Sequence, residues 1–85
     1  MVKLLFRQKH GYNVAVYPDD HEPAHVHVWK DNMDIRVFLD PIEFGENPGF
    51  KTADLRRIRK LVTKHKDMLF EKWVEYHGIP GSEEY

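Results

Sequence analysis

Three histidines lie within seven residues in the first half of the chain, and their spacing suits metal or acid–base chemistry. Alternate residues of a strand point to the same side, about 6.6 Å apart at Cα. The imidazoles of His25 and His27 could therefore bind one metal ion at about 2.0–2.1 Å. His21, in the preceding acidic loop, could supply a third ligand, and Asp19, Asp20 or Asp40 could supply an oxygen or hold a ring tautomer. One interpretation is a site for a divalent metal, such as zinc, held by His21, His25 and His27.

Two kinds of catalysis and one structural role are open to these histidines. A metal ion with one open position would activate water for hydrolysis. Without metal, His25 and His27 could act as catalytic acid and base, because imidazole titrates near neutral pH. That pair could cleave RNA, in which the 2′-OH is an internal nucleophile, with Arg36 holding the phosphate. In the structural alternative, the histidines hydrogen-bond to the Asp-rich loop and fix the start of the strand.

Composition excludes several other kinds of site. The chain has 85 residues and no cysteine, so disulfides and thiolate sites are excluded. Its only serine, Ser82, lies near the C-terminus, and no glycine-rich phosphate loop occurs. No apolar run approaches the ~18 residues of a membrane span, and the charged N-terminus does not resemble a signal peptide. We therefore expect a cytoplasmic protein without membrane contact, with one domain over residues 1–80 and a loose tail at 81–85.

The elements that must position the histidines are strands followed by one helix. Alternating apolar residues and turn residues at His10-Gly11 and Asp31-Asn32 predict four strands, at residues 2–7, 12–17, 25–30 and 33–39. Residues 40–49 are expected to be irregular. Helical spacing predicts one long helix with Thr52 as its N-cap, ended by Gly78 and Pro80. The expected fold is α+β: an antiparallel sheet of three or four strands, covered on one face by a single long C-terminal helix.

The two faces of such a sheet differ sharply in composition. Val2, Leu4 and Phe6 are expected to share one face of the first strand. Seven apolar residues of the later strands should face the helix: Val14, Val16, Val26, Val28, Ile35, Val37 and Leu39. The other face would carry His25, His27, Trp29, Arg36 and Phe38. Exposed aromatic surface of this kind marks an interface or a site, so we expect a partner protein, a homodimer, a nucleic acid or a small molecule to cover it.

The net charge of −1 hides a strong segregation along the chain. Residues 17–50 carry a net −6, and residues 51–66 carry a net +6. The basic helix segment could bind nucleic-acid phosphates through Arg56, Arg57, Lys60 and Lys64. Alternatively, this segment is a solvated face neutralised by the acidic middle of the chain.

The run Asp20-His-Glu-Pro-Ala-His-Val-His27 resembles the hallmark of a small bacterial family, the domain of unknown function 4160. The family pattern is Asp/Glu-His-x-Pro-Pro-His-x-His after an aromatic-rich strand. The resemblance extends to Gly49-Phe50, to Leu55–Ile58 and to Trp73, and so covers roughly residues 10–78. Ala24 replaces the usual second proline.

The resemblance implies a partner rather than a reaction. Members of the family are commonly encoded beside another small domain that looks like an antitoxin or a DNA-binding protein. The hypothesis is a small toxin–antitoxin-like component that binds a partner protein, with nucleic acid as a further candidate ligand. The alternative hypothesis comes from the histidine spacing: a metal-dependent or acid–base hydrolase, similar to an endoribonuclease, centred on His21, His25 and His27. The resemblance singles out His21, Pro23, His25 and His27.

Overall fold

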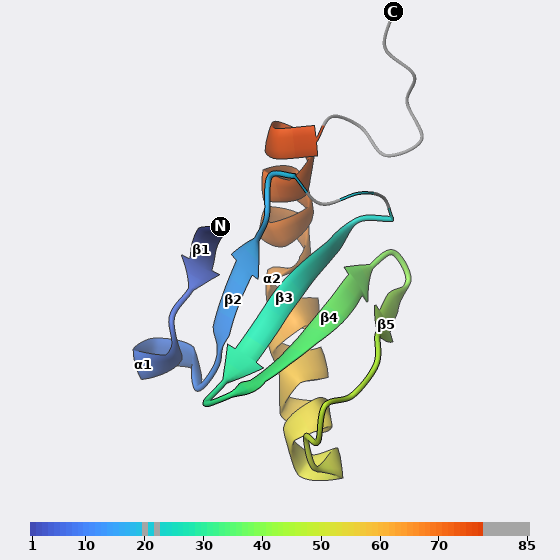
Figure 1. Ribbon diagram of the computed structural model, residues 1–85. Coiled ribbons are helices and arrows are strands. Elements are labelled where there is room, and N and C mark those ends of the chain that lie inside the picture. Colours follow the sequence, from blue (N-terminus) through green and yellow to red (C-terminus); the bar gives the residue numbers. More distant parts are fainter. Residues whose placement is uncertain (20, 22, 78–85) are drawn as a thin grey trace, which may run out of the picture.

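Five strands form one antiparallel sheet in which each strand pairs with its neighbours in sequence. The computed structural model describes residues 1–19, 21 and 23–77. The strands in this part of the chain are β1 (Val2–Leu5), β2 (Asn13–Val16), β3 (His25–Lys30), β4 (Met33–Leu39) and β5 (Ile42–Phe44). The long helix α2 (Thr52–His77) passes behind the sheet in Figure 1. The fold is therefore α+β, as predicted, with five strands rather than three or four.

The fifth strand is the largest departure from the predicted fold. Residues 42–44 pair with β4 over only three positions, with Ile42 opposite Leu39. The neighbouring Pro41 and Gly45 made this segment look irregular, and such a short edge strand carries little alternation of its own. Pairing continues past the strand, since the amide of Gly45 donates to the carbonyl of Arg36 at 2.8 Å. A Cβ at Gly45 would lie 3.3 Å from the Arg36 Cβ, so glycine suits this close approach.

The first strand is shorter than predicted and contains a bulge. The register shifts between Lys3 and Leu5, so that Leu5 pairs with Val14. An extra residue moves the alternation by one position, which buries Leu5 and leaves Phe6 exposed. The prediction that Val2, Leu4 and Phe6 share one face was therefore wrong.

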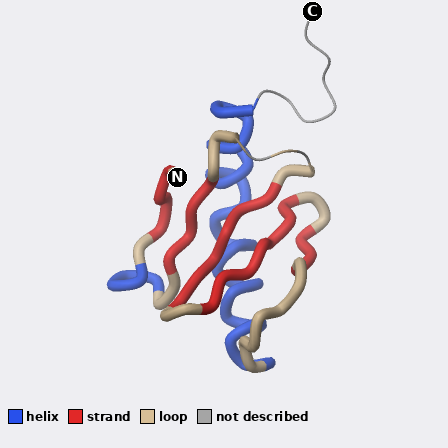
Figure 2. The backbone as a smooth tube through the Cα atoms, viewed as in Figure 1, coloured by secondary structure: helices blue, strands red, loops and turns tan. Residues whose placement is uncertain are grey.

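A single helical turn replaces the predicted tight hairpin after β1. This turn, α1 (Arg7–His10), ends at Gly11, whose φ of 85° places it in the left-handed region. The amide of Gly11 donates to the Arg7 carbonyl at 2.8 Å. Glycine accepts this conformation at little cost, so its position at the turn is confirmed while the turn itself is longer. Figure 2 shows α1 in the connection that joins β1 to β2, at the end of the two paired strands.

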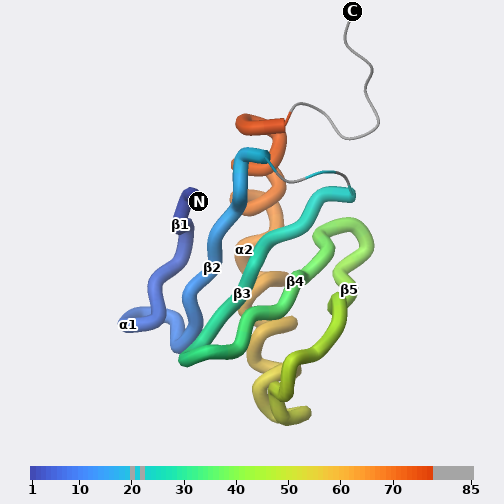
Figure 3. Tube along the Cα trace, viewed as in Figure 1, coloured from blue at the N-terminus to red at the C-terminus, as the bar shows by residue number. Residues whose placement is uncertain are grey.

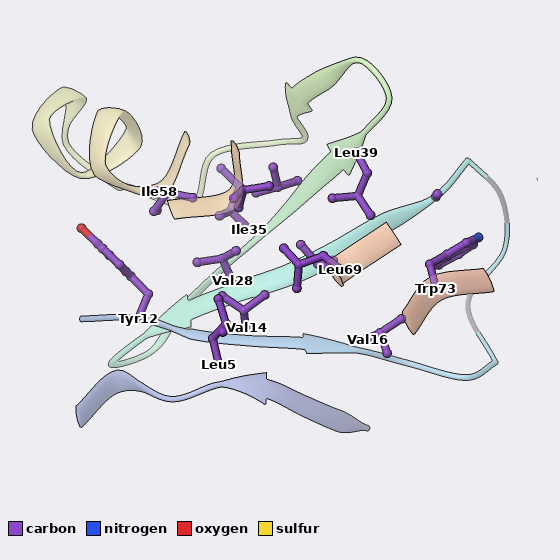
Figure 4. Close-up of a cluster of buried hydrophobic side chains, with 14 of the residues drawn as sticks. Leu5, Tyr12, Val14, Val16, Val28, Ile35, Leu39, Ile58, Leu69 and Trp73 are labelled. Atoms are coloured by element: carbon purple, nitrogen blue, oxygen red, sulfur yellow. The ribbon is translucent and has the colours of Figure 1, made fainter. Parts of the chain in front are cut away.

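The core lies between the sheet and α2, as the alternation predicts. The seven apolar strand residues expected to face the helix are each at most 1% exposed. The helix contributes four buried side chains: Ile58, Val62, Leu69 and Trp73. Figure 4 shows how the labelled side chains from the two layers meet. Twist of the sheet lets one diagonal helix pack on β3 and β4, as the traces of Figures 1 and 3 also show.

The ends of α2 bear on two predictions. The amide of Leu55 donates to the carbonyl of Lys51 at 3.0 Å. The residue whose carbonyl accepts the first helical bond is the N-cap, so Lys51 takes this position rather than Thr52. Gly78, Pro80, the domain boundary at 80 and the tail lie outside the described residues. No helix in the described part of the chain is long and apolar enough to cross a membrane.

Candidate functional site

Most of the predicted site residues of the sheet lie on the face that α2 leaves uncovered. In the β3–β4 ladder, His27 is paired with Arg36, and Trp29 with Asp34. Their burial is graded, with Arg36 exposed and His27, Trp29 and Phe38 half-buried. The alternation therefore placed His27, Trp29, Arg36 and Phe38 correctly.

His25 departs from this arrangement. Its side chain is buried, and its ring centroid lies 5.3 Å from that of Trp73 on α2. His25 is the first residue of β3, so its ring lies at the end of the sheet, where the last turns of the helix reach it. The Nδ1 atom is 2.9 Å from the carbonyl oxygen of Pro23. His25 therefore lies beside His27, as the alternation predicts, but its ring is buried rather than open, because the last turns of α2 reach the end of the strand.

Five rings join the uncovered face to the end of α2. We call Tyr17, His25, His27, Trp73 and His77 the histidine–aromatic cluster. The edge-on contact of Tyr17 with His27 has a centroid distance of 4.3 Å, and His27 lies 5.2 Å from His25. His77 stacks on Trp73 at 3.6 Å, with the planes 10° apart. The cluster therefore runs continuously around one end of the sheet.

His77 closes the cluster through the backbone. Its Nε2 lies 3.0 Å from the carbonyl oxygen of Tyr17, and its Nδ1 lies 3.0 Å from that of Trp73. Carbonyl oxygens only accept hydrogen bonds, so both contacts are hydrogen bonds only when both ring nitrogens carry a proton. The indole Nε1 of Trp73 is buried and has no hydrogen-bond partner among the described residues. The cluster thus fixes the loop after β2 to the C-terminal end of α2.

The predicted metal ligands do not form a metal-binding group in the described part of the chain. Within residues 1–19, 21 and 23–77, no three His, Asp or Glu side chains are arranged to hold an ion. His21 is exposed, and His25 is engaged by the Pro23 carbonyl. Asp20 lies outside the described residues. The zinc site at His21, His25 and His27 therefore remains a prediction that this geometry does not support.

The uncovered face is hollowed beside His27. This hollow has a volume of about 420 Å³ and is lined by His27, Asp34, Arg36, Glu46 and Pro48. The Nδ1 of His27 lies 3.4 Å from Oδ1 of Asp34. Sequence reasoning did not single out Asp34 or Glu46. Asp34 was predictable from the Asp31-Asn32 turn. A two-residue turn fixes the register of the two strands, and that register places Asp34 diagonally across from His27.

A second hollow lies between α1, the sheet and α2, and it is strongly basic. It has a volume of about 400 Å³. Its walls combine helix residues with residues of the sheet side: His10, Gly11, Tyr12, Lys30, Arg57, Lys60, Leu61 and Lys64. The sequence indicated Arg57, Lys60 and Lys64, but not Lys30 or His10. Arg56, also predicted to bind phosphates, is exposed outside this hollow.

The chain matches the family model of a domain of unknown function, DUF4160, over residues 11–74. The match covers more than half of the sequence. The chain belongs to this family. The same comparisons find no significant match among curated proteins or solved structures.

The DUF4160 match includes four of the five rings of the histidine–aromatic cluster. Tyr17, His25, His27 and Trp73 fall within residues 11–74, and His77 follows them. The basic hollow is also mostly inside the matched region, since only His10 precedes it. Both features therefore belong to the DUF4160 part of the chain.

Three titratable groups of the DUF4160 domain, Tyr12, Asp54 and His65, have shifted pKa values in or near the basic hollow. Burial, and next the hydrogen bond that its hydroxyl donates to Asp54 at 2.6 Å, raises the pKa of Tyr12. The same hydrogen bond is the main cause that lowers the pKa of Asp54. Burial, followed by the charge of His10, lowers the pKa of His65. The rings of His10 and His65 meet edge to face at 5.3 Å.

Proposed function

We propose that this DUF4160 chain is a small cytoplasmic binding module, a toxin–antitoxin-like component. It docks a partner protein on the uncovered face of the sheet and contacts nucleic acid through the basic side of α2. The observation that carries the proposal is the uncovered face itself. No other element of the described chain lies on it, and its aromatic side chains are only half-buried.

The uncovered face has the make-up of a protein interface. Tyr17 and Trp29 line a hollow of about 360 Å³, which adjoins the hollow at His27 through Asp34. Interfaces typically combine aromatic anchors at the centre with a polar rim. Here Trp29 supplies an anchor, and Arg36 and Asp34 supply polar groups around it.

Docking of a partner protein on the sheet is tested with the protein encoded by the neighbouring gene. Co-expression should give a complex that survives gel filtration. The double variant Trp29→Ser, Phe38→Ser should weaken it by about 30-fold or more, since anchor residues contribute at least ~2 kcal/mol. Tyr76→Ser, which removes an exposed aromatic from α2, is the matched control. Equal loss with both variants would contradict docking at the sheet.

A second copy of the chain is the alternative occupant of this face. Light scattering over a concentration range distinguishes the two cases. A chain that is monomeric alone and forms a complex with the partner protein supports the proposal. A homodimer that dissociates in the Trp29→Ser variant would show instead that a second copy of the chain covers this face.

The nucleic-acid half of the proposal predicts strong salt dependence. The logarithm of the binding constant should fall linearly with the logarithm of salt concentration, by about one unit of slope for each basic contact. Filter binding with a radiolabelled oligonucleotide measures this slope. No retention at low salt would remove this half of the proposal.

An acid–base hydrolase acting on RNA is the second candidate, and the contact of His27 with Asp34 favours it. Asp34 could orient the ring of His27 while Arg36, opposite in the ladder, steadies a phosphate. RNA cleavage that His27→Ala abolishes, in a folded variant, would support this function. Stoichiometric zinc after dialysis would point instead to the metal-dependent form. The absence of both cleavage and growth inhibition would reject it.

A further inference from the structure

The hollow on the helix side of the molecule collects positive charge from both layers of the fold. Lys30 comes from the end of β3, while Arg57, Lys60 and Lys64 come from the first half of α2. Among the residues that the structure describes, no carboxylate side chain lines this hollow of about 400 Å³. Cations that converge on one concave surface raise the local positive potential and attract anions.

The spacing on α2 selects which cations face this hollow. Positions 57, 60 and 64 lie along one stripe of a helix, because neighbours three or four residues apart share a face. Other cations of the same segment are held elsewhere. Arg59 donates to the carbonyl of Ile42 at 3.1 Å, and Nζ of Lys66 lies 3.9 Å from a carboxylate oxygen of Asp40. The basic segment of the sequence is thus divided between two sides of the helix.

Two of the three lysines of the hollow, Lys60 and Lys64, have no direct partner for their charge in the described part of the chain. Neither Lys60 nor Lys64 forms an ion pair with any described carboxylate. Arg57 lies 3.6 Å from Asp54, but that carboxylate also accepts the hydrogen bond of Tyr12. Within the described residues, the acidic middle of the chain therefore makes no direct ion pair with Lys60 or Lys64.

We infer that this hollow is a phosphate-binding site formed by Lys30, Arg57, Lys60 and Lys64. The inference deepens the nucleic-acid half of the proposed function and rests on it for the source of the phosphate. The lysines act as point charges, and the planar guanidinium of Arg57 can bind two phosphate oxygens. Tyr12 and Leu61 supply an apolar wall for whatever carries the phosphate.

Inorganic phosphate is the first probe. The full ¹⁵N-labelled chain is titrated with it, against chloride at equal ionic strength. We expect saturable amide shifts concentrated at Gly11, Lys30 and Leu61. Uniform small shifts, or shifts reproduced by chloride, would overturn the inference.

Two double variants separate a built site from general charge. Lys60→Gln with Lys64→Gln removes two charges from the hollow, and Lys3→Gln with Lys51→Gln removes two charges outside it. All four side chains are exposed, so both variants should fold, which circular dichroism checks. The first should weaken phosphate binding at least 10-fold, and the second less than 3-fold. Equal weakening would show diffuse attraction and overturn the site.

A 5′-phosphorylated single-stranded oligonucleotide then identifies the source of the phosphate. If the hollow variant loses both probes, the phosphate is that of a nucleic acid. If phosphate binds in the hollow and the oligonucleotide does not, the site stands with a small phosphorylated ligand, and the nucleic-acid half of the proposed function is wrong. If the oligonucleotide binds and both double variants weaken it equally, the proposed function stands and the site is overturned.

Discussion

At the scale of single residues, the hydrogen bond from Tyr12 to Asp54 ties the start of β2 to the first turn of α2. The hydroxyl lies 2.6 Å from the carboxylate, and in Figure 4 it points away from the labelled apolar side chains. The negative charge of Asp54 near the N-terminus of α2 also interacts favourably with the helix dipole. The bond therefore joins the two layers directly beside the basic hollow.

Tyr12→Phe should lower the free energy of unfolding by about 1 kcal/mol at pH 7, because it removes one part-buried hydrogen bond. The pKa of Tyr12 is raised in the folded chain by burial and by Asp54. As pH rises above about 10, the unfolded tyrosine loses its proton first, so stability falls. Urea denaturation at pH 7 and pH 10.5 measures both effects. Tyr76→Phe is the control, and a variant as stable and as alkali-sensitive as the wild type would contradict the prediction.

His65 lies at helical spacing between the buried Val62 and Leu69, and this position predicts a core histidine whose ring nitrogens are hydrogen-bonded. Its Nε2 is buried with no hydrogen-bond partner among the described residues. Burial first, and then the charges of His10, Lys64 and Lys9, lower its pKa. The packing of this side of α2 was therefore predicted correctly, but Nε2 of His65 lacks the expected hydrogen bond from the described residues.

His65→Leu should make stability less dependent on pH. Below about pH 6.5 the unfolded histidine takes up a proton that the folded ring resists. This contribution to stability is complete above that pH and is lost as pH falls through the lower folded pKa. Denaturation between pH 7.5 and pH 5 should show a smaller decline for His65→Leu than for the wild type. A decline in His65→Leu that runs parallel to that of the wild type would refute the idea.

At the scale of elements, the end of α2 is held to the loop after β2 by His77. Its ring stacks on Trp73 and contacts the carbonyl of Tyr17. These contacts connect residues 60 positions apart. The helix end and the loop should therefore loosen together when the ring is removed.

His77→Ala should lower the free energy of unfolding by about 1–2 kcal/mol, from one lost hydrogen bond and one ring contact. Hydrogen exchange should accelerate at Tyr17 and in the last turn of α2. Tyr76→Ala, on the exposed side of the same turn, should cost less than about 0.5 kcal/mol. Unchanged exchange at Tyr17 would show that the ring does not hold the loop.

At the scale of the whole molecule, the long helix α2 and the five-stranded sheet share one core in the described part of the chain. Leu69 is fully buried in that core, and Figure 4 shows it facing the strand side chains. A domain of this size has a stability of about 5–10 kcal/mol. Because neither layer has another core, sheet and helix should unfold together.

Leu69→Ala should cost about 3–5 kcal/mol, the usual effect of a buried leucine cavity. Helix loss, followed by circular dichroism, should coincide with the fluorescence change of Trp29 and Trp73 in both the variant and the wild type. Val74→Ala, at a partly buried position on the same helix, should cost less. Separate transitions for the two signals would contradict a single shared core.

The local features of the chain were predictable from its sequence. Alternating apolar residues predicted the bounds and the buried faces of β3 and β4, because period-two geometry acts over a few neighbouring residues. The Asp31-Asn32 turn is confirmed for a similar reason, with Asp31 at a φ of 56°. Helical spacing likewise predicted α2, whose apolar side chains pack on the sheet.

Tertiary structure alone decided where residues distant in the sequence meet. His25 is buried because Trp73 reaches it from α2, and no spacing within β3 contains that distance. The basic hollow needs Lys30 from the sheet beside Lys60 and Lys64. The short strand β5 exists because β4 offers it backbone hydrogen bonds. The sequence by itself determined β3, β4 and α2 and their apolar faces, since those depend on local geometry, whereas the sites depend on contacts that only the packed chain creates.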